Sequence, residues 1–143
     1  MCYTGACPVD DGDYLVFIDL RVFISPQHWS YVHAEAFYGA LSKMFNVREA
    51  NIELLNDASS EYTLGVKLHF QIRIKAKDYP SVQALHNAAQ AIPEAIWQPD
   101  FKGALVSALD AVSKRIDKID YSRYGYMESR DIEVLNAMAL PIG

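Results

Sequence analysis

Residues 62–75 alternate apolar and polar side chains without interruption, and this pattern constrains the fold more than any other feature. A period of two residues is the spacing of a β-strand, whose successive side chains point to opposite faces of a sheet. The segment therefore predicts a long strand with one apolar face, which another layer must cover, and one polar face. The apolar positions are Tyr62, Leu64, Val66, Leu68, Phe70, Ile72 and Ile74.

Two further segments have the same period. In residues 14–24 every even position is apolar, whereas the odd positions are partly apolar and partly charged. Residues 48–55 place Ala50, Ile52 and Leu54 on one face and precede a polar turn at 56–60. This second segment and the strand at 62–75 predict an antiparallel hairpin. Its expected register brings Glu49 and Glu53 near Lys67, Gly65 or His69.

Helical spacing accounts for most of the remaining chain. Ser25 and Pro26 form a helix start, and apolar residues at spacings of three and four continue to residue 45. Asp78, Tyr79 and Pro80 open a second helix, Pro93 and Pro99 frame a connector around Trp97, and a third helix follows Asp100. A last helix is expected from near Ser129, with its apolar side formed by Ile132, Leu135, Met138 and Ala139.

The predicted order is thus β-α-β-β-α-α-α, an α+β fold with a three-stranded antiparallel sheet of strand order 2-3-1. Its first five elements form a plait-like core, an incomplete ferredoxin-like arrangement without the last strand. The helices should cover the even face of the strands, with additional C-terminal helices packed on one face. The odd face then stays uncovered unless the C-terminal helices wrap around it. We expect one domain over 1–143, comprising an N-terminal arm (1–13), the core (14–92) and a C-terminal helical part (93–143).

Composition excludes several classes of protein. The 143 residues carry a formal net charge of −5 and are 51% hydrophobic, which argues against general disorder and against a nucleic-acid binder driven by bulk charge. No apolar run is long enough for a transmembrane helix, and the N-terminus lacks a secretion signal, so a cytoplasmic protein (host cytoplasm if viral) without membrane contact is expected. Cys2 and Cys7 fit two ordinary thiols, while loss of Met1 would make Cys2 an N-terminal nucleophile.

The odd face of the long strand is the first candidate site. Lys67, Arg73 and Arg21 are suited to hold a phosphate or carboxylate, with His69 as acid or base and Gln71 beside them. Three interpretations remain open for this face: a solvated sheet surface, a subunit interface, and a small-anion or nucleotide site. A concave pocket containing both Arg21 and Arg73 would favour the anion site.

Two other groups are candidate interface residues. Acidic side chains near the N-terminus suit a basic partner surface, and a tyrosine-rich loop suits a protein contact. These groups are Asp10, Asp11 and Asp13, and Tyr121, Tyr124 and Tyr126. No phosphate-binding glycine loop, nucleophile elbow or paired-histidine motif is present, so we assign no catalytic residue, metal or cofactor.

The run from Lys67 to Leu85, a long alternating strand that leads directly into a helix, resembles the strand-helix joint of bacteriophage tail-terminator proteins. These are small ring-forming subunits with an α-β-β-α core. The similarity lies in pattern rather than in diagnostic residues, and the first strand and helical C-terminus depart from it. The resemblance favours assembly.

Together these observations favour a non-catalytic assembly or protein-binding subunit whose partner is another protein or a second copy of the chain. A structural subunit of a virus or mobile element, and a small acidic inhibitor of a host protein, are the two forms considered. The alternative is a small-anion or nucleotide-binding protein or enzyme that uses the basic face of strand 62–75. Whether the chain is an enzyme stays open, with the first hypothesis preferred.

Overall fold

The computed structural model describes residues 12–23, 31–56, 66–116 and 129–142. Within these ranges the chain forms strands and α-helices in the order β1-α1-β2-β3-α2-α3-β4. Short 3₁₀ turns precede β2, α2 and β4. The bounds are β1 Tyr14–Val22, α1 Tyr31–Phe45, β2 Ile52–Asn56, β3 Val66–Ile74, α2 Val82–Ile96, α3 Phe101–Ile116 and β4 Ile132–Pro141.

The strands form one antiparallel sheet of order β2-β3-β1-β4. The predicted α+β class and the order 2-3-1 of the first three strands are confirmed. The predicted number of strands is wrong, because a fourth strand pairs with β1 over its whole length. The C-terminal part 93–143 is therefore not entirely helical, since its last described segment completes the sheet.

The helix expected at Ser129 is instead strand β4, and a β-bulge explains the error. Asp19 pairs with Asn136 and Leu20 with Val134, so Leu135 is an extra residue in the ladder. The inward positions are even before the bulge (Ile132, Val134) and odd after it. This change of parity breaks the two-residue period and leaves apolar residues at three-residue spacing, which is typical of a helix.

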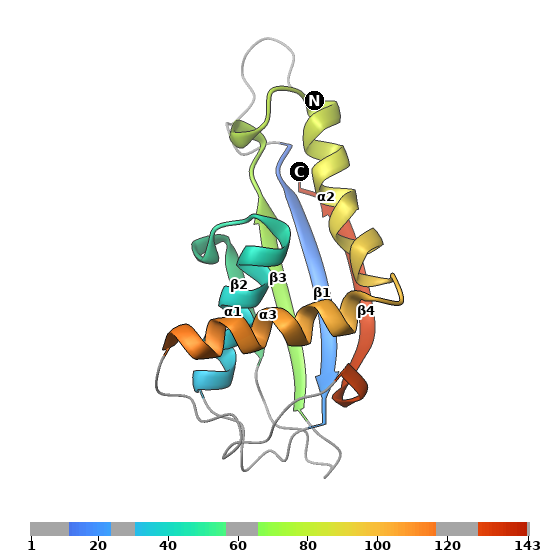
Figure 1. Cartoon of the computed structure of the whole chain (residues 1–143). Helices are drawn as coiled ribbons and strands as arrows, with labels where there is room; N and C mark the ends of the chain where they lie inside the picture. The colour runs from blue at the N-terminus through green and yellow to red at the C-terminus, as the bar shows by residue number, and fades with distance from the viewer. Residues whose placement is uncertain (1–11, 24–30, 57–65, 117–128, 143) are drawn as a thin grey trace.

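All three described helices lie on the same face of the sheet, with α3 crossing over α1 (Figure 1). The even residues of β1 and β3 point toward this layer and, apart from the partly buried Tyr14, are buried, as expected from their period. Phe37 of α1 stacks on Phe70 of β3 with ring centroids 5.8 Å apart. At the α1–α3 contact, a Cβ added to Gly39 would lie 2.9 Å from Val112 Cγ1, so glycine permits this close approach.

Three local expectations need correction. Helix α2 continues through Pro93 to Ile96, so the predicted connector around Trp97 is shorter. Its N-cap is Ser81, whose hydroxyl accepts from Ala84 N, and residues 76–78 form a separate 3₁₀ turn. In the hairpin, Glu53 pairs with Gln71, and Glu49 lies in a 3₁₀ turn before β2. A bulge near the end of β2 shifts the register.

The long strand β3 is internal, and the sheet edges are β2 and β4. A helix side chain hydrogen-bonds the backbone of each edge strand. The hydroxyl of Tyr38 in α1 accepts from Leu54 N of β2 at 2.7 Å, and Trp97 Nε1, just after α2, donates to Ala137 O of β4 at 3.2 Å. These contacts occupy part of each edge, where unpaired backbone N–H and C=O groups are otherwise free to pair with another strand.

Candidate functional site

The candidate site is the sheet face opposite the helices, which no described helix covers (Figure 1). We call it the open face. The odd residues of β1 and β3 lie on it, as predicted, together with Glu53 of β2 and the outward residues of β4. Its β1, β3 and β4 residues are Leu15, Phe17, Asp19, Arg21, Lys67, His69, Gln71, Arg73, Glu133, Asn136, Met138 and Leu140.

At the end where β1 begins, the β1 and β4 residues of the open face are apolar, whereas β3 contributes Gln71 and Arg73 there. Leu15 pairs with Leu140 across β1 and β4, and Phe17 pairs with Met138 in the same way. Met138 and Leu140 are 42% and 46% exposed, and the two β1 residues are half-buried. These four residues form one contiguous block, which we call the apolar cluster. Sequence analysis noted its β1 half but missed its β4 half, because β4 was taken for a helix.

The other end of the open face is charged, and its charges are paired across strands. His69 Nδ1 of β3 lies 2.8 Å from Asp19 Oδ1 of β1. Arg21 Nη1 of β1 lies 3.3 Å from Glu133 Oε1 of β4. Two of the predicted anion-binding cations therefore already contact carboxylates. Lys67 is exposed and pairs in register with Arg21, and Gln71 lies between Phe17 and Glu53.

Asp13, predicted as an interface residue, is 3% exposed. Its Oδ2 accepts from Arg73 Nε at 3.1 Å, and its Oδ1 accepts from Ala76 N at 2.8 Å. Its main-chain oxygen accepts from Ile142 N at 2.8 Å. Asp13 thus joins the start of β1 to the ends of β3 and β4, and we call these contacts the Asp13 junction. Burial leaves this carboxylate little surface to offer a partner.

A hollow of about 480 Å³ lies beside the Asp13 junction and includes Arg73 but not Arg21. Arg73 pairs with Leu15, six residues from Arg21 along β1. At about 3.4 Å per residue, the two arginines lie roughly 20 Å apart along the strand. The structure therefore does not bring them together, and the residues around the hollow are mixed in charge: Asp13, Leu15, Ala50, Asn51, Glu53, Gln71, Arg73, Lys75 and Lys77.

Several predicted positions lie outside the described residues: Asp10, Asp11, Tyr121, Tyr124, Tyr126, Cys2 and Cys7. Their predicted roles stay predictions. His86 lies on α2, away from the open face, and a hydrogen bond of 2.8 Å joins its Nδ1 to the Tyr14 hydroxyl. Sequence reasoning also missed Trp97, whose contact with β4 depends on a strand that was not foreseen.

Within the described ranges, no cluster of three or more His, Cys, Asp or Glu is arranged to hold a metal ion. No described helix combines the length and apolar character needed to cross a membrane. No protein-family model, curated protein or solved structure matches the chain.

Proposed function

We propose that this protein is a non-catalytic assembly subunit that associates with a second copy of itself through the open face. The apolar cluster carries the proposal. A sheet face that is exposed only to solvent usually carries polar side chains, whereas this face exposes a contiguous block of Leu, Phe and Met. Large exposed apolar patches are typical of protein interaction sites.

The dimensions of the open face are compatible with a stable contact. Three strands about 30 Å long and the shorter β2 of about 17 Å, spaced about 4.8 Å apart, cover roughly 510 Å² per copy, or about 1,000 Å² for two copies. That estimate reaches the roughly 1,000 Å² expected of a specific interface. A two-fold axis near Phe17 and Met138 would place the two apolar clusters against each other and leave the charged ends at the rim.

The charge pairs favour a protein partner over a small anion at this face. Arg21, His69 and Arg73 each contact a carboxylate, so an anion would compete with Glu133, Asp19 and Asp13, respectively. A neutralised surface does not repel its own copy, because the charges on each side are already compensated. The two interpretations therefore differ in a measurable way, since only the anion site needs those cations to be accessible.

The edge contacts favour face-to-face packing over strand addition. Tyr38 and Trp97 already hydrogen-bond the backbones of β2 and β4. Pairing a foreign strand along either edge would have to displace these side chains. The open face has no such covering in the part of the chain that the structure describes.

Light scattering at micromolar concentration tests the proposal. We expect the wild-type protein to be a dimer or larger, and Met138→Glu to be monomeric because it places a charge in the centre of the apolar cluster. The matched control is Val82→Glu on α2, at a side chain that is 80% exposed and lies in the helix layer. It should leave the assembly unchanged.

A wild-type protein that stays monomeric would contradict self-assembly, as would a Met138→Glu protein that assembles like the wild type. Thermal unfolding of each variant distinguishes a broken interface from a broken fold. The viral or mobile-element origin and the form as an acidic inhibitor of a host protein stay predictions.

A further inference from the structure

On the helix side, two adjoining cavities meet near the end of β3, away from the apolar cluster. The first, of about 560 Å³, lies between α1, α2 and the start of α3, and we call it the apolar slot. The second, of about 740 Å³, lies between the end of α1, the 3₁₀ turn before β2 and the end of β3, and we call it the basic hollow. Val47, Ile74 and Tyr79 line both, so the two cavities adjoin each other.

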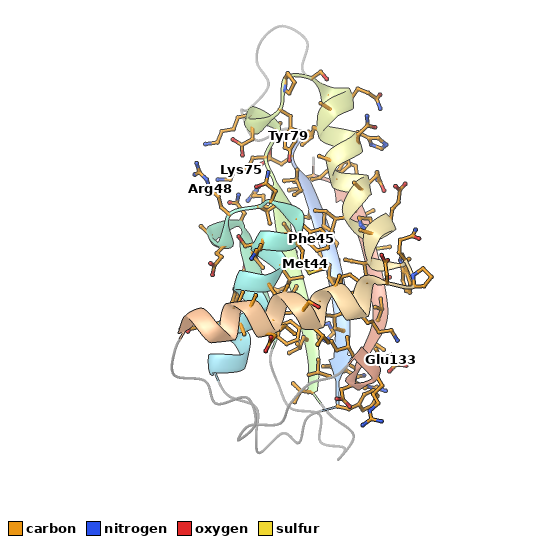
Figure 2. The ribbon with its side chains drawn as sticks, viewed as in Figure 1. Met44, Phe45, Arg48, Lys75, Tyr79 and Glu133 are labelled. Carbon is orange, nitrogen blue, oxygen red and sulfur yellow. The ribbon has the colours of Figure 1, made fainter. Side chains whose placement is uncertain are left out.

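Most of the residues that line the apolar slot are apolar and suit a hydrocarbon, and Gln98 and Asp100 are its polar residues. Met44 and Phe45 come from the end of α1, and Ala88, Ala91 and Ile92 come from α2. Tyr79 lines both this slot and the basic hollow. Figure 2 labels Tyr79 together with Met44 and Phe45. The small alanine side chains on α2 leave room that larger residues would fill. A volume of this size is in the range of small-molecule sites.

The basic hollow gathers several cations that form no ion pair within the described part of the chain. Lys43, Arg48 and Lys75 line it, and none of them forms an ion pair with a described residue. Figure 2 shows Arg48 and Lys75 on the same side of the molecule, at the end of β3. Arg73 also lines the hollow but is held by Asp13, and Asp78 is the acidic residue of the lining.

The hollow therefore has an excess of positive charge on a chain whose formal net charge is −5. Its polar lining also includes the side chains of Asn46 and Asn51, which are able to donate hydrogen bonds. An anionic group that enters the hollow would meet Lys43, Arg48 and Lys75, which form no ion pair with a described residue, and the carboxylate of Asp78.

We propose that these cavities form a binding site for a small amphiphile, an alkyl chain that ends in a carboxylate or phosphate. The chain would occupy the apolar slot, and the anionic head would lie in the basic hollow against Arg48 and Lys75. Neither half suffices alone, because solvated lysines bind simple anions weakly and an apolar slot gives no orientation. The adjoining cavities supply both, and the inference does not rest on the proposed assembly, although Arg73 and Lys75 also line the hollow beside the Asp13 junction.

Isothermal titration calorimetry with dodecyl phosphate and with dodecanoate, each below its micellar concentration, tests the site on the full chain. We expect saturable binding at one site per chain, and comparison of the two probes identifies the preferred head group. Inorganic phosphate is the probe for the head group alone and should bind at least about tenfold more weakly, because it leaves the slot empty.

Variants separate the two halves of the site. Arg48→Glu and Lys75→Gln should each weaken binding of the preferred amphiphile by about tenfold, and the loss should shrink at high salt. Ala91→Trp should abolish binding by filling the slot. The matched controls are Lys67→Glu, an exposed lysine on the open face, and Val82→Trp, an exposed position on the same helix as Ala91. Both controls should bind like the wild type.

The proposal is overturned if the wild-type protein binds neither amphiphile, or if inorganic phosphate binds as tightly as dodecyl phosphate. It is also overturned if Ala91→Trp keeps full affinity while remaining folded by circular dichroism. Light scattering on the same samples shows whether assembly changes, so failure of this site and failure of the open-face proposal are distinguishable.

Discussion

The two faces of strand β1 show how differently one short segment is used on its two sides. Val16, Ile18 and Leu20 are fully buried beneath the helix layer, whereas Leu15 and Phe17, on the other face, are only half-buried. Both faces carry apolar residues, so hydrophobicity alone does not distinguish the core from the surface. The placement of the helices distinguishes the two faces, because all the described helices pack on one side of the sheet.

The comparison also separates two kinds of charged contact on the open face. The Asp13 junction is buried and joins three strands through hydrogen bonds to both side chain and backbone. The Asp19–His69 and Arg21–Glu133 pairs are partly exposed and join only neighbouring strands. Burial should therefore make the first contact important for folding, and exposure should make the other two weak.

The largest expected difference in stability is between truncating a phenylalanine on the buried face of the sheet and truncating one on the open face. Phe70 is 1% exposed and stacks on Phe37, so Phe70→Ala should lower the free energy of unfolding by about 3–5 kcal/mol. Phe17→Ala on the open face should cost under about 1 kcal/mol in the monomer. Urea unfolding measures both. Equal losses would show that the open face is covered in the monomer, which would contradict the comparison.

The second effect compares two aspartates. Asp13→Ala should cost about 2 kcal/mol, because it removes the acceptor of Ala76 N and the partner of Arg73. Asp19→Ala breaks a partly exposed contact with His69 and should cost under about 1 kcal/mol. Denaturant midpoints of the two variants provide the test. A larger loss of unfolding free energy for Asp19→Ala than for Asp13→Ala would mean that the Asp19–His69 contact stabilises the fold more than the Asp13 junction does.

A third variant tests how tightly the helix layer seals the core face. Gly39→Ala gains helix propensity but puts a methyl group against Val112, a β-branched side chain with little freedom to move. We expect a net loss of about 1 kcal/mol, since overpacking exceeds the gain of about 1 kcal/mol in propensity. Thermal unfolding measures it. A stabilised variant would indicate that α3 is free to shift away from α1.

The smallest effect concerns the exposed pair Arg21–Glu133. A double-mutant cycle with alanine at both positions should give a coupling free energy under about 1 kcal/mol that falls as salt is added. A coupling above about 2 kcal/mol, independent of salt, would indicate that this end of the open face is desolvated, as in an interface.

Much of the fold follows from local pattern. The periods at 14–24 and 62–75 predicted strands β1 and β3 and the faces of their side chains, and the order 2-3-1 followed from chain connectivity. The open-face residues Arg21, Lys67, His69, Gln71 and Arg73 were therefore placed on the correct face. The contacts of Arg21, His69 and Arg73 with carboxylates were not foreseen. For Arg21 the reason is that its partner, Glu133, belongs to a strand that was predicted as a helix.

Side-chain period is a property of consecutive residues, so the sequence by itself determined which residues of β1 and β3 share a face. Burial of Asp13 and the bulge at Leu135 depend on how distant segments pair. Asp13 stands in an acidic run with Asp10 and Asp11, and nothing local distinguishes it from them. Only the tertiary structure brings Arg73 and the backbone of Ala76 to its carboxylate, and those hydrogen bonds are what make burying that charge tolerable.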